Sequence, residues 1–362
     1  MPGASSLPMA IDHTAFPEII DAILNDSARD ALLSFRGASS YYLEKINAQL
    51  FKHVCIVCVD SKPIDNTSEL QRHTFLLLDV DGERLPISHF TVDEIDDDNE
   101  TPKAHWRGRH RGMTKHIVVK LLHYVQVVDS PITFPRCNNV DMPNLRVTRV
   151  YDEDTEELPW SYYQPPADTI VMWASQLPLA PPVYDNDPSL VFHHVIRHVV
   201  INVSIGEACR DADPFSDFKA SWRLPKVIII VTPKSPISLY DWSFVSQNLI
   251  RFLKVAGQGR TESAVQIVGL AEALRQTYSL LVPAIDLEAM TAGSLYDLMK
   301  GCHWLVALLG NEPEAHVPIL LRELFETLEQ FSVPCMELPD YKKTLTTDEI
   351  ATQLIPNSFI EL

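Results

Sequence analysis

Two cysteines stand in the chain at a spacing that could hold a metal ion or support redox chemistry. Cys55 and Cys58 belong to the sequence CIVC, and C-x-x-C is typical of zinc ligands and dithiol centres. The surrounding run HVCIVCVD (residues 53–60) is apolar and strand-like, and residues three apart on a strand point to opposite faces. No second pair of Cys or His follows nearby. We therefore interpret both as buried structural cysteines.

Three histidines are the next candidates for metal binding. In FHHVIRHVV, His194 and His198 would share one face of a helix, and His193 stands beside them. The glutamate of an H-E-x-x-H zinc motif is missing, and the run leads into a strand-like segment. We interpret them as ordinary structural histidines, so the sequence predicts no metal site here.

The remaining candidates for chemistry also have simpler structural interpretations. DVDGERLP (residues 79–86) lacks the ligand spacing and the final glutamate of a calcium loop, so we expect a turn at Asp81 and Gly82. The carboxylates of residues 152–154 fit a solvated loop. The 12 glycines form no G-x-G-x-x-G, Walker A or G-x-S-x-G motif. The sequence thus predicts no catalytic residue, no metal and no cofactor.

Composition narrows the classes of protein further. The 362 residues are 46% apolar and 22% charged, as in a globular protein with a sizeable core. The formal net charge of −18 argues against general binding to nucleic acid or to an anionic membrane. We find no signal-peptide pattern and no apolar stretch near the roughly 20 residues of a spanning helix. Six scattered cysteines fit reduced thiols, so we expect a cytoplasmic or nuclear protein.

The elements that must position any functional residue begin with short helices. Residues 12–50 read as three of them, and Pro17 suits the first turn of the first helix. That helix carries an apolar stripe formed by Ile19, Ile20, Ile23 and Leu24. Asp26 and Ser27 are N-cap candidates for the second helix. Three helices of this size bury little apolar surface by themselves.

Strand-like runs follow the helices. Residues 53–60 and 74–80 are two of them, and an acidic run at residues 92–100 reads as a solvated loop or a disordered insert. The neighbouring residues 105–116 form the one basic cluster of the sequence. We expect this cluster to pair locally with the acidic run.

From residue 120 onward, β-branched and apolar runs recur with a rhythm. Markers placed at residues 125, 147, 170, 199, 227 and 265 are separated by 22, 23, 29, 28 and 38 residues. The first four steps match the roughly 20–29-residue period of leucine-rich repeats, in which each unit adds one parallel strand. The strict L-x-x-L-x-L-x-x-N consensus is absent, so this signal is degenerate.

In the last third of the chain the helical patterns lengthen. Residues 241–257, 287–301 and 312–331 alternate with strand-like runs such as residues 303–310 and 332–338. Alternation of this kind predicts a parallel sheet flanked by helices. A solenoid and a Rossmann-like sheet both satisfy it, and the rhythm that continues from residue 120 favours the solenoid.

The N-terminal helices resemble the F-box, a three-helix module. Phe16, Pro17, Glu18, Ile19 and Ile20 match its opening, with Phe in place of the usual Leu. LLSFRGAS (residues 32–39) matches the second helix and LFKHV (residues 50–54) matches the exit. Tyr-Tyr at residues 41–42 stands where the family often has a tryptophan. An F-box followed by a degenerate repeat array is similar to the F-box-like proteins expanded in mushroom-forming fungi.

The resemblance implies a fold class and a domain organisation. We expect an α/β protein with an F-box-like three-helix module at residues 12–54, followed by connecting strands at residues 55–119. A leucine-rich-repeat-like array with parallel strands would occupy residues 120–340, and a C-terminal tail residues 341–362.

The resemblance also implies a function, namely a non-enzymatic substrate receptor. The F-box would bind the Skp adaptor of a cullin–RING ubiquitin ligase, and the repeat domain would bind a target protein of unknown identity. The implied adaptor-binding residues are Phe16, Pro17, Ile20, Ile23, Leu24, Leu32 and Phe35. A short helical trio with more apolar surface than it can bury suits such a partner.

Three alternatives remain open from the sequence. The same apolar residues could pack onto the chain's own first strands. The C-terminal half could be a Rossmann-like enzyme for a small molecule, with a pocket at the carboxyl ends of strands near Val231, Val268 and Leu309. The protein could also be an interaction scaffold that does not bind an adaptor.

Overall fold

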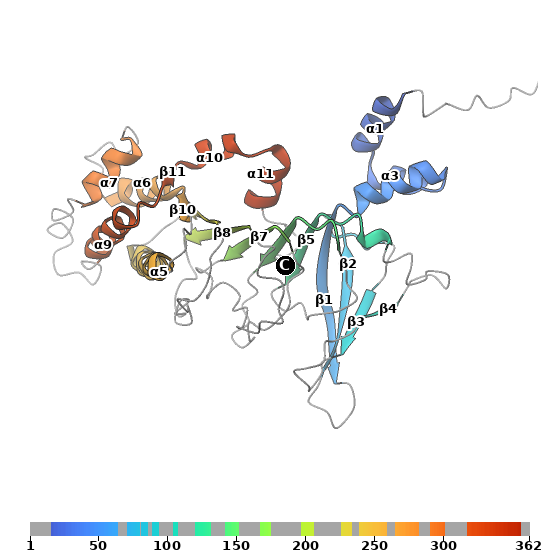
Figure 1. Ribbon diagram of the computed structural model, residues 1–362, viewed down its shortest axis with the longest axis horizontal. Helices are drawn as coiled ribbons and strands as arrows, with labels where there is room; N and C mark the ends of the chain where they lie inside the picture. Colours follow the sequence, from blue (N-terminus) through green and yellow to red (C-terminus); the bar gives the residue numbers. More distant parts are fainter. Residues whose placement is uncertain are drawn as a thin grey trace, which may run out of the picture.

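The computed structural model shows an α/β fold with one long sheet and helices on both of its faces (Figure 1). The structure describes residues 16–63, 71–79, 81–85, 89–93, 104–107, 120–131, 142–151, 167–174, 197–205, 226–233, 239–258, 265–281, 290–300 and 317–355. The predicted fold class of α/β with mostly parallel strands is therefore confirmed at this level.

Eleven strands form the sheet. In chain order they are β1 (His53–Pro63), β2 (Gln71–Leu78), β3 (His89–Asp93), β4 (Ala104–Arg107), β5 (Val127–Pro131), β6 (Val147–Tyr151), β7 (Thr169–Ala174), β8 (His198–Ile205), β9 (Lys226–Pro233), β10 (Val265–Val268) and β11 (Cys335–Met336). Their order across the sheet is β11-β10-β9-β8-β7-β6-β5-β1-β2-β3-β4. β1 and β5 to β11 run parallel, whereas β2, β3 and β4 extend the other side as an antiparallel meander.

The meander contains the first residues of two segments that the sequence analysis singled out, the acidic run and the basic cluster. The acidic run begins inside β3, and its residues 94–100 lie outside the described residues. The basic cluster begins inside β4, and its residues 108–116 also lie outside them. The predicted pairing between the two runs stays a prediction, although β3 and β4 are neighbouring strands.

The predicted rhythm corresponds to neighbouring parallel strands. Successive register partners are Val128, Thr148, Ile170, Val199, Val227 and Val265, which lie 20, 22, 29, 28 and 38 residues apart. Four of them (residues 170, 199, 227 and 265) coincide with the markers chosen from the sequence. From β5 to β11 each described strand lies beside the one before it in the chain. This one-way succession is the strand order of a repeat array, since a doubly wound sheet reverses direction.

The described helices are distributed over two faces of the sheet. They are α1 (Pro17–Asp26), α2 (Arg29–Phe35), α3 (Ser40–Leu50), α5 (Leu239–Gln258), α6 (Leu270–Leu281), α7 (Ala292–Lys300), α9 (Val317–Gln330), α10 (Leu338–Thr344) and α11 (Thr347–Leu354). We name the face that carries Val128, Ile170 and Val227 the outer face, and the face that carries Asp129 and Arg149 the inner face. Within the described part of the chain, no helix has both the length and the apolar character needed to cross a bilayer.

The outer face holds two apolar cores. One core packs the outward side chains of β7 to β10 against α5, α6, α7 and α9, and Trp242, Leu274 and Tyr278 are fully buried in it. The other core joins the N-terminal helices to β1, β2 and β5, with Ile46 and Phe51 fully buried. Strands with outward side chains at every second position thus bury them beneath helices on this face.

Among the described helices, the two nearest the C-terminus cover part of the inner face. α10 and α11 lie over it (Figure 1), where Tyr341 packs against Val171, Val200 and Ile230. The sequence analysis treated residues 341–362 as a tail, but residues 338–354 contain these two helices. They complete a helix–sheet–helix arrangement on this part of the sheet.

The N-terminal helices begin as the sequence predicts, with one exception. α1 starts at Pro17, and Phe16 occupies the N-cap position. The prediction of Asp26 or Ser27 as the N-cap of α2 is wrong, because Ala28 holds that position without a side-chain cap. Ser27 instead ends α1, where its hydroxyl donates to Ile23 O over 2.6 Å. The predicted module boundary at residue 54 falls inside β1, and the domain division stays a prediction.

Candidate functional site

The seven predicted adaptor-binding residues divide into an exposed and a buried group. Phe16, Pro17, Ile23 and Phe35 are exposed, Ile20 is half-buried, and Leu24 and Leu32 are buried in the core shared with β1 and β2. Packing onto the chain's own strands therefore holds for Leu24 and Leu32, whereas adaptor binding by the exposed residues stays a prediction. Successive residues of one helix separate in this way because only one side of α1 faces the core.

The exposed group is larger than the prediction. Ile19 on α1 is 57% exposed and Leu43 on α3 is exposed as well. The described chain has eight exposed large apolar residues, and five of them lie within residues 16–43. Ile19 was visible in the apolar stripe of the sequence, whereas Leu43 gave no separate signal. The N-terminal helices therefore carry a concentration of exposed apolar surface, which we name the N-terminal apolar surface: Phe16, Ile19, Ile23, Phe35 and Leu43.

Polar contacts fix these helices to the body of the protein. Arg29 Nε on α2 lies 2.6 Å from a carboxylate oxygen of Asp79, which is buried after β2. Gln49 Nε2 on α3 donates to Leu24 O over 3.2 Å, and Lys45 of α3 forms an ion pair with Asp21 of α1. The hydrogen bond to Asp21 raises the pKa of Lys45, so Lys45 stays charged at neutral pH. The N-terminal apolar surface is therefore held in a defined orientation.

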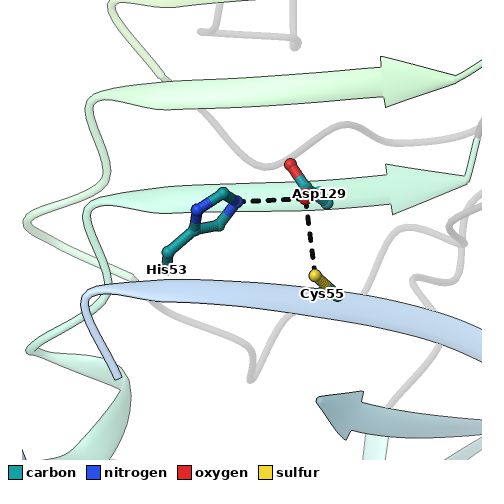
Figure 2. Close-up of side chains that lie close together, drawn as sticks. All are labelled: His53, Cys55 and Asp129. Atoms are coloured by element: carbon teal, nitrogen blue, oxygen red, sulfur yellow. Dashed lines mark hydrogen bonds and ion pairs between the residues drawn. The ribbon is translucent and has the colours of Figure 1, made fainter. Parts of the chain in front are cut away.

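A buried polar cluster joins β1, β5 and β6 on the inner face. Figure 2 shows His53 and Cys55 of β1 pointing toward Asp129 of β5. Cys55 Sγ donates to Asp129 Oδ2 over 3.4 Å, and His53 Nε2 lies 3.0 Å from the same oxygen. Arg149 Nε of β6 lies 3.2 Å from Asp129 Oδ1. Cys55 and Asp129 are fully buried and Arg149 is 3% exposed, so the carboxylate is surrounded by donors from two strands.

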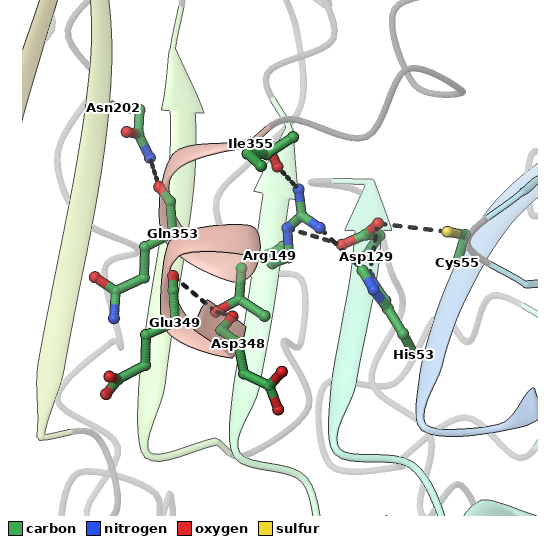
Figure 3. A network of polar contacts seen from close by, with 10 residues as sticks. His53, Cys55, Asp129, Arg149, Asn202, Asp348, Glu349, Gln353 and Ile355 are labelled. Carbon is green, nitrogen blue, oxygen red and sulfur yellow. Dashed lines mark hydrogen bonds and ion pairs between the residues drawn. The ribbon is translucent and has the colours of Figure 1, made fainter. Parts of the chain in front are cut away.

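Arg149 extends the cluster along the inner face. Its Nη1 lies 3.5 Å from His53 Nε2, and its Cζ lies 4.6 Å from the ring centroid of Trp173. Its Nη2 donates to Ile355 O, as Figure 3 shows. On β8, Asn202 Nδ2 donates to Gln353 O over 2.8 Å. The last residues of α11 and the residue after it therefore rest on polar side chains of β6 and β8.

His53, Cys55 and Asp129 are the group in the described residues that could hold a metal ion, because their ligand atoms lie within 4.8 Å of one another. Arg149 weakens this interpretation, since its guanidinium already neutralises Asp129 and also approaches His53. Two unit charges about 4 Å apart repel by about 4 kcal/mol at an effective dielectric constant of 20. A divalent cation would face that repulsion for each unit of its charge. The cluster is therefore better described as a buried ion-pair network.

Catalysis by Cys55 is also poorly supported by this geometry. In a Cys-His-Asp triad the imidazole lies between the thiol and the carboxylate. Here the thiol and His53 both contact one oxygen of Asp129, so the carboxylate lies between them. The thiol is also fully buried and cannot meet a substrate in this conformation. The prediction that Cys55 is a buried structural cysteine is confirmed.

The structure describes some of the other candidates from the sequence analysis, and the rest lie outside the described residues. Gly82 has a φ of 77°, and the Asp79 side chain accepts from the amides of Asp81 and Glu83, so the predicted turn is confirmed. His198 is exposed at the start of β8. His193, His194, residues 152–154 and Leu309 lie outside the described residues, and β1 contains Cys58.

The strand ends proposed for a small-molecule pocket are occupied by the protein itself. Gly269, directly after β10, has a φ of 80°, and a Cβ there would lie 2.4 Å from Val231 O. Its amide donates to Met336 O over 3.0 Å. This glycine therefore serves close backbone packing between strands, and its amide does not face a ligand.

The polar cluster was missed by the sequence analysis. The available signal was a charged residue within an apolar strand run, Asp129 in HYVQVVD and Arg149 in LRVTRVYD.

Comparisons with family models, with curated proteins and with solved structures find no match. The class of protein that the structure defines is an α/β protein with a one-way succession of parallel strands and helices on both faces.

Proposed function

We propose that the protein is a non-enzymatic, F-box-like substrate receptor of a cullin–RING ubiquitin ligase. Its N-terminal helices would bind the Skp adaptor, and its strand array would bind a target protein in the cytoplasm or nucleus. The observation that carries the proposal is the N-terminal apolar surface, which includes three of the seven predicted residues, Phe16, Ile23 and Phe35, together with Ile19 on α1 and Leu43 on α3.

The energetics of that surface favour a partner. Burial of apolar surface contributes about 25 cal/mol per Å² to the free energy of association. A partner that buried these five exposed apolar side chains would therefore gain binding free energy from them. Large exposed apolar patches on proteins mark interaction sites, and five of the eight exposed large apolar residues of the described chain lie on these helices. The contacts of Arg29 and Gln49 hold the helices in place before binding, which lowers the entropy cost of association.

The strand array suits the second half of the proposal. Parallel strands added in one direction create an extended surface on one face, which repeat proteins use for recognition. The enzyme alternative has less support, because Gly269, which follows Val268, packs its backbone against Val231 O and donates its amide to Met336 O. The scaffold alternative remains an outcome of the test.

The test is co-purification with the Skp adaptor. The double variant Phe16→Ala/Ile23→Asp changes two residues that are 59% and 47% exposed, so it removes apolar surface without disturbing the core. We expect it to retain less than about one tenth of the adaptor bound by the wild type, a loss of roughly 1.4 kcal/mol or more.

Ile319→Asp on α9 is the matched control, because Ile319 is 51% exposed and lies far from the N-terminal helices in Figure 1. It should bind as the wild type does. Equal recovery of the adaptor with the double variant, or no recovery with the wild type, would overturn the receptor function and favour a scaffold.

A further inference from the structure

Basic side chains line the edge of the sheet where its parallel strands begin. Lys52 precedes β1, Arg146 precedes β6, Arg197 precedes β8, and Lys226 begins β9, and all four are exposed. We name these four residues the basic edge; Asp168, before β7, interrupts it.

Arg197 and Lys226 of the basic edge belong to the neighbouring strands β8 and β9, whereas β5 lies between the strands of Lys52 and Arg146 and β7 between those of Arg146 and Arg197. The amide of Thr169 donates to Arg146 O over 3.0 Å, and the amide of Lys226 donates to Arg197 O over 3.2 Å. Four cations along one edge contrast with the net charge of −18 for the whole chain. A local excess of positive charge attracts and orients acidic segments.

An acidic helix of the same chain already lies at this edge. The sequence of α11, TDEIATQL, contains two acidic residues and no basic one. Asp348 lies 2.9 Å from Lys52 Nζ, and Figure 3 shows Asp348 and Glu349 at the end of α11 nearest the strand starts. The hydrogen bonds from Thr346 lower the pKa of Glu349, and the charge of His198 adds to this. The Glu349 carboxylate is therefore ionised at neutral pH.

The C-terminal end of α11 is bound through backbone carbonyls, which every helix has at this end. The last carbonyls of a helix lack intrahelical donors. Here Asn202 donates to Gln353 O, and Arg149 donates to Ile355 O just beyond the helix. Leu354 adds one apolar contact with the inner-face core. The inner face thus recognises an acidic helix start, an apolar residue and a carbonyl end.

The contacts that hold α11 against the sheet are weak. None of its residues is buried. Its ion pair to Lys52 joins side chains that are 48% and 77% exposed, and such pairs contribute about 0–1 kcal/mol. Gln353 Oε1 also accepts from Tyr341 of α10 over 2.7 Å. A helix without a buried residue can leave the sheet at low cost, which would expose Arg149 and Asn202 beside the basic edge.

We propose that the inner face between the basic edge and Asn202 is a binding site for an acidic amphipathic helix of a target protein, and that α11 occupies this site in the free protein. The identity of the partner as a ligase target rests on the proposed function. The site itself is defined by the contacts of α11. Because α11 competes in cis, the apparent affinity for a partner is reduced by the fraction of closed molecules.

The test uses the full chain and a fluorescein-labelled synthetic peptide with the sequence of residues 345–355. Leu354→Asp removes the apolar contact of α11 and leaves the sheet residues intact. Fluorescence anisotropy should show about tenfold tighter peptide binding to this variant than to the wild type. Thr346→Ala/Glu349→Ala, which removes the N-terminal capping box of α11 and the charge of Glu349, is a second way to release it and should act in the same direction.

Charge reversals test the role of the basic edge. In the Leu354→Asp background, Lys52→Glu/Lys226→Glu should weaken peptide binding at least tenfold. Lys254→Glu/Arg322→Glu, on α5 and α9 of the outer face, is the matched control and should change it less than twofold. A peptide with lysine at both acidic positions should not bind.

The proposal is overturned if the released variants and the wild type bind the peptide equally, if no saturable binding occurs, or if both charge reversals act alike. Adaptor recovery should be the same for Leu354→Asp and the wild type. Failure of the peptide experiment therefore leaves the adaptor function standing, and failure of adaptor binding leaves the peptide site standing.

Discussion

At the scale of single residues, Asp129 is the most constrained charge in the described chain. It is fully buried and contacts His53 and Cys55 on β1 and Arg149 on β6, the two strands beside its own. Removing one partner of a buried ion pair leaves the other charge uncompensated, which costs about 3–5 kcal/mol. The sheet therefore depends on this carboxylate for the junction of β1, β5 and β6.

Asp129→Asn should accordingly lower the free energy of unfolding by about 3–5 kcal/mol in urea denaturation. The control Asp348→Asn removes an exposed carboxylate and should cost less than about 1 kcal/mol. Since we describe the cluster as an ion-pair network, treatment of the wild type with a chelator should leave its urea midpoint unchanged. Similar losses in the two variants, or a midpoint that falls with the chelator, would contradict this description.

Gly269 is a second residue whose identity is set by its surroundings. Its φ of 80° is strained for other residues, and a Cβ would lie 2.4 Å from the carbonyl oxygen of Val231. Gly269→Ala should lower the free energy of unfolding by about 1–3 kcal/mol or more, measured by thermal or urea denaturation.

Gly293→Ala provides the comparison for that experiment. This glycine lies on α7, and a Cβ there would meet nothing within 4 Å. The substitution should raise stability by up to about 1 kcal/mol, because alanine favours the helix. A loss of the same size in both variants would show that the approach of Val231 is not the cause.

At the scale of elements, α11 is the helix that we expect to lose stability first as the pH falls. Its capping box joins Thr346 and Glu349, and the hydrogen bonds from Thr346 lower the pKa of Glu349. A carboxylate with a lowered folded pKa stabilises the fold above its unfolded value and loses that contribution as the pH falls through the folded value. The affected window therefore lies below the ordinary value of 4.5.

Hydrogen exchange measured at pH 6 and at pH 3.5, and corrected for intrinsic rates, should show protection of the α11 amides falling at the lower pH. Glu349→Gln should reduce protection at pH 6 and make it nearly independent of pH over this range. The buried helix α6 serves as the internal reference. Parallel loss of protection in α6 and α11 would indicate global acid unfolding instead.

Individual elements also show how far sequence patterns reach. The apolar runs at residues 169–175, 198–204 and 226–233 became β7, β8 and β9 with bounds that nearly coincide, because strands buried on both faces are continuous apolar runs. The two C-terminal helices were missed because they are short and mostly polar. The N-cap of α2 was misplaced because Ser27 bonds backward to Ile23 instead of forward.

At the scale of the whole molecule, the outer face contains two separate apolar cores along one sheet. In arrays where each strand contacts its neighbours, stability is close to a sum of local terms. A substitution that destabilises one core should therefore have little effect on the stability of the other.

Leu274→Ala on α6 tests this, because Leu274 is fully buried in the core beneath β8 to β10. We expect a local loss of about 2–5 kcal/mol, seen as faster hydrogen exchange in β8, β9 and β10 with little change in β1 and β2. Ile46→Ala, fully buried in the N-terminal core, should give the reciprocal pattern. Uniform acceleration by either variant would show one cooperative unit.

The sequence by itself determined the α/β class, the three N-terminal helices and the succession of strands, because these follow from local hydrophobic periodicity. It could not separate the exposed Phe16 and Ile23 from the buried Leu24, since one stripe contains residues of both kinds. Only the tertiary structure placed Asp129 beside Arg149, because their contact depends on the register between strands 20 residues apart in the chain. It also brought α11 onto the inner face, a contact between segments more than 150 residues apart at Asn202 and Gln353. Periodicity records which side of an element is apolar, whereas the partner of each polar side chain is decided by the assembled sheet.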